Sequence, residues 1–168
     1  DIDVTTSAVT YWESSEDGQT LIQPLCSIKR LGDAAIKQII ENRPFENAED
    51  LLFKEGVTYS KLNKKALDVL CRSGALDEVV DDSFTGMKHF WMSCIQNRPK
   101  NKKKMQENIQ EWFEEGEFSR EEKIENISNL TGIFPFDLVL SRDVRSAIQR
   151  YQVPALGDWD PELQAAWF

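Results

Sequence analysis

One stretch of the chain combines a tight turn, a helix start and basic side chains. It is IKRLGDAA, residues 28–35, in which Gly32 is free to adopt a positive φ. Positive charge lies nearby at Lys29, Arg30 and Lys37. A helix that begins after Gly32 exposes backbone N–H groups at the positive end of its dipole, and such groups bind phosphate oxygens. The pattern therefore fits contact with a nucleic-acid backbone, which carries no sequence information. An ordinary helical hairpin in a core is the open alternative.

The elements that must position this turn are helices. Apolar residues recur at spacings of three and four over residues 34–42, and Pro44 predicts the end of that helix. Asn47 is an expected N-cap for the next helix and Asn63 for a third. Gly74 stands where a left-handed C-cap is expected. The sequence thus predicts two helical hairpins in tandem.

The segments on either side differ in character. Residues 8–12 and 20–25 flank an SSEDGQT turn and predict a small β-hairpin. Residues 83–132 predict two or three helices, with HFWMSCIQ buried and RPKNKKK exposed as a loop or helix start. Residues 142–152 predict a short amphipathic helix.

Charge is distributed unevenly along the chain. The net charge of −9 argues against a simple nucleic-acid binder. However, residues 26–104 carry fifteen bases and eleven acids, whereas residues 105–168 carry five bases and thirteen acids. A phosphate-binding surface is therefore expected in the middle segment.

The sequence contains little that could catalyse a reaction. Three cysteines lie far apart without a C-x-x-C pair and His89 is the single histidine, so a zinc site is not expected. The cysteines are predicted to be buried, reduced thiols. No phosphate-binding loop, H-E-x-x-H motif or nucleophile with an adjacent base is present in the sequence. No apolar run spans a bilayer.

The turn at residues 28–35 resembles the helix-hairpin-helix motif, which runs hydrophobic–x–Gly–hydrophobic–Gly followed by x–x–x–Ala. Gly32 matches the second glycine, and Arg30 stands where the first is expected. NAEDLL and KLNKKALDVLCRSGALDEV follow in the order expected for the alpha subunit of DNA polymerase III, the bacterial or phage-type C-family replicative polymerase. The resemblance covers Asp1 to Val79.

The resemblance implies a tandem helix-hairpin-helix module that grips double-stranded DNA near the polymerase active site. It implies these DNA-binding residues: Lys29, Arg30, Leu31, Gly32, Asp33, Ala34, Lys37, Lys61, Lys64, Lys65 and Arg72. It also implies a monovalent cation on backbone carbonyls near Ile28 and Leu31. Mg²⁺ is expected in the palm of the parent polymerase and not in this segment, which lacks the clustered catalytic carboxylates. The alternative for KLNKK is a solvated helix start.

The end of the chain, LQAAWF, resembles the short peptide by which bacterial polymerases hold the sliding clamp. Its anchors are expected to be Leu163, Gln164, Trp167 and Phe168. The alternative is a pair of aromatic residues that cover a neighbouring helix.

The predicted fold is mainly α, with a small N-terminal β-hairpin, a tandem helix-hairpin-helix and a further helical segment. Its expected parts are residues 1–26, 27–80, 81–153 and 154–168. The predicted function is non-catalytic, sequence-independent binding of double-stranded DNA within a replicative polymerase, with a log–log salt slope of about −3 to −4. The alternatives are a module that contacts the clamp or another replication protein, and a stand-alone helix-hairpin-helix repair factor. The expected location is the cytoplasm of a bacterial or phage-infected cell.

Overall fold

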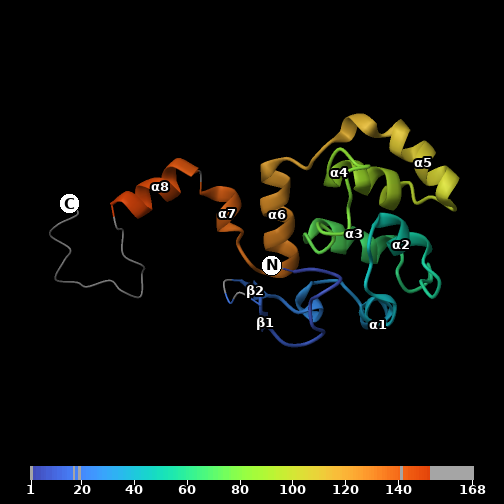
Figure 1. Cartoon of the computed structure of the whole chain (residues 1–168), viewed down its shortest axis with the longest axis horizontal. Helices are drawn as coiled ribbons and strands as arrows, with labels where there is room; N and C mark the ends of the chain where they lie inside the picture. The colour runs from blue at the N-terminus through green and yellow to red at the C-terminus, as the bar shows by residue number, and fades with distance from the viewer. Residues whose placement is uncertain (1, 17, 19, 141, 152–168) are drawn as a thin grey trace. The chain divides into compact units, whose positions relative to one another are not determined.

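A computed structural model gives the fold in Figure 1 and describes residues 2–16, 18, 20–140 and 142–151. The chain divides into two compact units, residues 1–134 and 135–168. Unit 1 contains β1 (Glu13–Ser14), β2 (Leu21–Ile22), the 3-10 helix η1 (Leu25–Ser27), α1 (Asp33–Asn42), α2 (Ala48–Phe53), α3 (Lys64–Arg72), α4 (Met87–Phe90), the π-helix η2 (Trp91–Gln96), α5 (Lys102–Glu111), the 3-10 helix η3 (Phe113–Glu115) and α6 (Arg120–Thr131). Unit 2 contains α7 (Phe136–Val139) and α8 (Arg142–Arg150). The mainly α fold with a small β-hairpin is thus confirmed.

The core of unit 1 forms around α3, which contacts η2 and α6 (Figure 1). Leu67 and Leu70 of α3 are fully buried, and so is Phe90 at the end of α4. The Phe90 ring meets that of Phe84 edge to face, with ring centroids 5.2 Å apart, a favoured geometry for aromatic pairs. Burial of these apolar side chains holds the helices against one another.

The expected helix ends are confirmed where the signal is local. The side chain of Asn47 accepts the N–H of Asp50 and caps α2, and Asn63 accepts the N–H of Ala66 and caps α3. Gly74, just beyond α3, has a φ of 85°, the left-handed geometry expected of it. Such caps satisfy backbone groups that have no partner within the helix.

The β-hairpin is confirmed, but it is short. Its antiparallel strands pair Glu13 with Ile22 and Ser14 with Leu21. The segment after it differs from the prediction, because the expected first helix of the first hairpin is only the three-residue turn η1. Pro24 lies directly before η1 in an extended conformation, and this leaves few residues before the turn at 28–32.

The segment HFWMSCIQ is mostly buried, as predicted, and its last six residues form the π-helix η2. His89 is fully buried between two protein partners. Its Nδ1 accepts the backbone N–H of Thr85 at 3.0 Å, so its Nε2 carries the proton and donates to the carbonyl oxygen of Ile109 at 2.8 Å. The single histidine is therefore a satisfied core residue.

The cysteines divide into one exposed and two buried thiols. Cys71 and Cys94 are buried as expected, whereas Cys26 is exposed, which corrects the prediction for that residue. Burial raises the pKa of the Cys94 thiol to about 12 and that of Cys71 well above its ordinary value. Both buried thiols therefore remain protonated and unreactive near neutral pH.

We expect a thiol reagent such as Ellman's reagent to modify only one cysteine of the folded protein rapidly, because Cys26 alone is exposed. All three should react in denaturant. Cys26→Ser should abolish the rapid phase and leave the slow one. Rapid modification of more than one thiol in the folded protein would contradict the burial of Cys71 and Cys94.

Unit 2 consists of residues 135–168. Its longer helix is α8, which the sequence predicted over nearly the same residues. Among the described residues, no helix is long and apolar enough to cross a membrane. The four-part division and the cytoplasmic location stay predictions.

Candidate nucleic-acid interface

The turn at residues 28–32 is held by the core beneath it. Ile28 and Leu31 are 2% and 8% exposed, and so anchor both ends of the turn. The backbone N–H of Lys29 donates to the carbonyl oxygen of Leu130 at 2.8 Å, at the end of α6. The side chains of Lys29 and Arg30 are exposed. The turn therefore presents two cations to solvent from a fixed backbone.

The structure assigns the strained position of this turn to Arg30. Arg30 has a φ of 70°, whereas Gly32 has a φ of −81° and a ψ of 153° and is the N-cap of α1. The expectation that Gly32 takes the positive φ is wrong. The left-handed residue stands where the motif that this turn resembles has its first glycine, and a side chain there carries a conformational cost.

The backbone N–H groups of Gly32, Asp33 and Ala34 have no acceptor among the residues that the structure describes. They are the first N–H groups of α1, which carry the positive end of its dipole. A Cβ atom added to Gly32 would meet no atom within 4 Å. Packing within the fold therefore does not require glycine at this position.

Gln38, which was not among the predicted site residues, links the two hairpins. It is 2% exposed on α1, and its Nε2 donates to the carbonyl oxygen of Gly56 at 3.0 Å. Its Oε1 accepts the backbone N–H and the hydroxyl of Thr58 at 3.1 and 2.7 Å. The loop of the second hairpin is thereby fixed to the helix of the first. In the sequence, the only sign of this role is that a polar residue stands among the apolar positions of residues 34–42.

The basic residues of the second hairpin lie around the start of α3. Lys61, Lys64 and Lys65 are all exposed, and we call them the hairpin-2 lysines. Lys64 Nζ donates to the carbonyl oxygen of Gln96 at 3.0 Å, so this lysine is held beside the end of η2. Lys37 of the first hairpin is 73% exposed and lies 3.7 Å from Glu41, a pair that solvent screens strongly.

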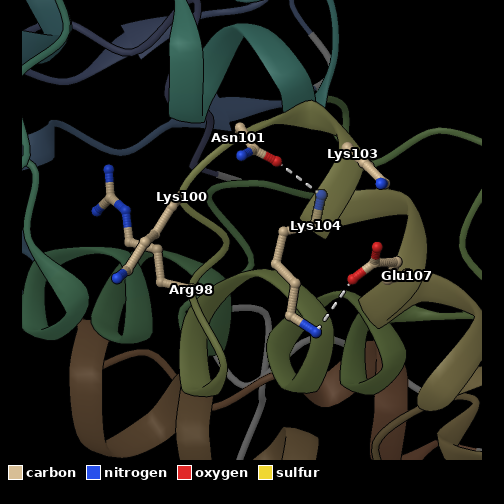
Figure 2. A pocket seen from close by; sticks show the side chains of 6 residues that line it. All are labelled: Arg98, Lys100, Asn101, Lys103, Lys104 and Glu107. Carbon is tan, nitrogen blue, oxygen red and sulfur yellow. Dashed lines mark hydrogen bonds and ion pairs between the residues drawn. The ribbon is translucent and has the colours of Figure 1, made fainter.

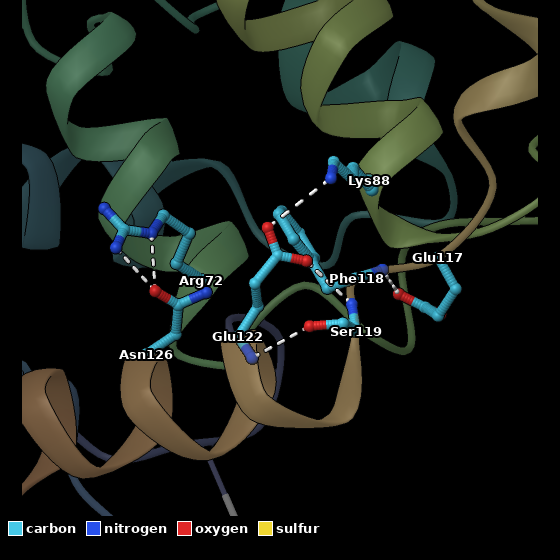
Figure 3. Close-up of polar contacts among 7 residues, drawn as sticks. All are labelled: Arg72, Lys88, Glu117, Phe118, Ser119, Glu122 and Asn126. Carbon is cyan, nitrogen blue, oxygen red and sulfur yellow. Dashed lines mark hydrogen bonds and ion pairs between the residues drawn. The ribbon is translucent and has the colours of Figure 1, made fainter.

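Arg72 faces a different partner. Its Nε donates to Oδ1 of Asn126 on α6 at 2.9 Å (Figure 3). Its NH1 also lies 3.6 Å from Oδ2 of Asp68. Its guanidinium is therefore engaged between α3 and α6, and a role in DNA binding stays a prediction. No local pattern in the sequence indicated the Arg72–Asn126 contact.

The first turn of helix α6 is stabilised by a capping box and an ion pair. Ser119 and Glu122 form a reciprocal capping box, which Figure 3 shows beside the Lys88–Glu122 ion pair of 3.4 Å. The hydrogen bond from the Ser119 backbone N–H holds the pKa of Glu122 below its usual range. The capped helix then reaches both the Lys29 turn and Arg72.

Two other predicted features are not tested by the structure. The clamp-binding residues Leu163, Gln164, Trp167 and Phe168 lie outside the described residues. For the monovalent cation, the carbonyl oxygen of Ile28 already accepts the N–H of Leu31 at 3.3 Å. No group of three or more His, Cys, Asp or Glu side chains in the described part of the chain is placed to hold a metal ion.

Comparison with known proteins bears on the first half of the chain. A family model described as a helix-hairpin-helix motif matches residues 1–86. DNA polymerase III subunit alpha of Helicobacter pylori strain ATCC 700392 / 26695 is 32% identical over 93 residues, which is 54% of this chain and 8% of that protein. The same subunit of strain J99 / ATCC 700824 is 31% identical over 93 residues, again 54% and 8%. The chain thus matches only a small part of each of these relatives.

Proposed function

Because the chain belongs to the helix-hairpin-helix family, we propose that residues 27–80 bind the backbone of double-stranded DNA without reading its sequence. This binding would be non-catalytic and would serve a replicative polymerase of which the segment is a part, as its likeness to DNA polymerase III alpha subunits suggests. Any Mg²⁺-dependent chemistry would belong to the rest of such a polymerase.

The first turn carries this proposal. Lys29 and Arg30 are exposed beside the unpaired N–H groups of Gly32, Asp33 and Ala34. Donors and cations grouped in this way suit the oxygens of a phosphodiester, and a phosphate can approach Gly32 because no Cβ stands in the way. Asp33 adds an exposed carboxylate, so the contact has to come from its backbone N–H and not from its side chain.

The two hairpins would act together. Gln38 fixes the loop of the second hairpin to α1, and the hairpin-2 lysines are exposed on that second hairpin. Contacts of this kind are electrostatic, so affinity should fall as salt rises, with a log–log slope of about −3 to −4 for three to five phosphate contacts.

The test is fluorescence anisotropy of the 168-residue chain with two labelled duplexes of unrelated sequence, measured over a range of salt concentrations. Affinity for the two duplexes should be equal within about 3-fold, because phosphate contacts carry no base information. Replacing Lys29, Arg30, Lys64 and Lys65 together with glutamine should weaken binding and make the slope shallower by about 3 to 4. No binding at low salt would refute the proposal.

A matched control variant distinguishes the effect of charge at the first turn from the effect of the protein's net charge. Lys88 and Lys123 are already paired with Glu122 and Glu117 at 3.4 Å each. Replacing both with glutamine removes the same charge as Lys29/Arg30→Gln. It should leave most of the DNA affinity intact. Equal loss in the two double variants would indicate nonspecific attraction to net charge.

A further inference from the structure

A second concentration of positive charge lies outside the matched residues 1–86. It surrounds a pocket of about 420 Å³ lined by Arg98, Lys100, Asn101, Lys103, Lys104 and Glu107, which we call the basic pocket (Figure 2). We infer that the basic pocket binds phosphates of the same DNA that the hairpins hold, and so extends the DNA-binding surface beyond the helix-hairpin-helix module. This inference rests on the function proposed above.

The fold places the basic pocket beside the hairpin-2 lysines. Arg98 NH1 donates to the carbonyl oxygen of Leu62 at 2.6 Å, and its guanidinium lies over the Tyr59 ring, 4.5 Å from the centroid. In the reverse direction, Lys64 Nζ of the second hairpin donates to the carbonyl oxygen of Gln96, just before the basic pocket in the sequence. These contacts join segments more than thirty residues apart in the sequence. They bring two groups of lysines to neighbouring positions on one compact unit.

Arg98 holds the segment that carries the basic pocket against the second hairpin. It is half-buried, and burial lowers the pKa of its guanidinium while the Tyr59 ring acts in the opposite direction. An arginine remains charged despite such a shift, because its ordinary pKa lies far above neutral pH. Its hydrogen bond to Leu62 and its aromatic contact explain why it sits at the edge of the pocket rather than extending into solvent.

The lysines of the basic pocket are available to a ligand. Lys100 and Lys103 are exposed, and Figure 2 shows no hydrogen bond or ion pair from either amino group to the other residues that line the pocket. Lys104 lies 3.4 Å from Glu107. Because this ion pair is exposed and weak, a phosphate could take the place of the Glu107 carboxylate beside Lys104. Asn101 already accepts the backbone N–H of Lys104 at 2.8 Å. The attraction therefore comes from side-chain charge and not from the helix end.

The charges in the first turns of α3 and α5, which both contact η2, also favour the binding of a polyanion. The first turn of α3 and that of α5 contain lysines and no acidic residue, whereas Glu49 and Asp50 open α2, and Glu121 and Glu122 open α6. Lysines at the positive end of a helix dipole are unfavourable for the isolated fold. Both α3 and α5 contact η2, and Glu49 of α2 already pairs with Lys102 of α5. A polyanion that reached Lys103, Lys104 and the lysines of α3 would offset the remaining charge.

Three variants test the inference with a labelled DNA duplex. Lys100, Lys103 and Lys104 replaced together with glutamine should weaken binding about 10-fold or more at low salt and make the salt slope shallower by about 2 to 3. Glu107→Gln should strengthen binding about 2- to 3-fold, because it removes a carboxylate from the pocket. Lys29/Arg30→Gln reports on the hairpin alone. Circular dichroism should show that all three remain folded.

The outcomes are distinguishable. Unchanged affinity in both pocket variants, with a loss in Lys29/Arg30→Gln, would overturn the inference and leave the proposed function standing. No binding by the unaltered chain at low salt would overturn both. A labelled polyglutamate peptide tests the competing hypothesis, in which the basic pocket binds an acidic protein segment. If it binds through Lys100, Lys103 and Lys104 while DNA affinity does not depend on them, the pocket serves an acidic protein segment and the inference is wrong.

Discussion

Gly86→Ala is expected to destabilise unit 1 by about 1–3 kcal/mol, the usual cost of forcing extra atoms into a packed site. A Cβ atom at Gly86 would lie 2.6 Å from the carbonyl oxygen and 2.7 Å from the carbonyl carbon of Gly116, and 2.9 Å from Cα of Glu117. All three are backbone atoms, so no side-chain rotation relieves the contact. The φ of Gly86 is 165°, extended backbone that any residue adopts, so the whole effect is steric.

The contact matters because it joins the start of α4 to the segment before α6. The backbone N–H of His89 donates to the same Gly116 carbonyl at 2.9 Å. Displacing Gly116 would stretch this bond and shift His89, whose ring bonds to Ile109 in α5. The cost should therefore appear as a lower midpoint of urea denaturation with an unchanged slope.

Gly32→Ala is the matched control for this change. It is the same substitution at a φ of −81°, and the added Cβ meets nothing within 4 Å. Its effect on stability should be less than about 1 kcal/mol, because the weaker N-cap is partly offset by a less flexible unfolded chain. If Gly86→Ala and Gly32→Ala shift the midpoint equally, the close approach of Gly86 to Gly116 is not present in solution.

Arg30→Gly is expected to raise the free energy of unfolding while it weakens DNA binding. A non-glycine residue with a φ of 70° costs about 1–2 kcal/mol, and glycine relieves that cost. Glycine also gives back about 0.5–1 kcal/mol through its more flexible unfolded state, so a net gain of about 0.5–1 kcal/mol is expected. The lost cation should weaken binding and make the salt slope shallower by about 1.

Lys29→Gly separates the two effects. It removes the same charge from the adjacent position, but Arg30 is the one non-glycine residue with positive φ in the described part of the chain. Glycine at position 29 therefore relieves no strain and should lower stability. Urea denaturation and duplex anisotropy on both variants check the prediction. A lower midpoint for Arg30→Gly than for the unaltered chain would show that Arg30 makes stabilising contacts in the turn.

The ends of α1, α2 and α3 could be predicted because their signals are local. A cap such as Asn47 or Asn63 acts on backbone groups three residues away, and Pro44 restricts the residue before it. Gly32 was misassigned for the opposite reason. A glycine is permitted at a positive φ but not confined to it, and the turn places that φ at Arg30 because Ile28 and Leu31 must both reach the core.

The sequence by itself determined the helical class, the helix ends and the segment in which positive charge collects, because each depends on residues within a turn or two of one another. Tertiary structure alone decided which of those charges come together. Arg98 reaches Leu62, Gln38 reaches Thr58 and Arg72 reaches Asn126 only after the core has packed. No spacing along the chain encodes these contacts, since they depend on how buried side chains fit between helices.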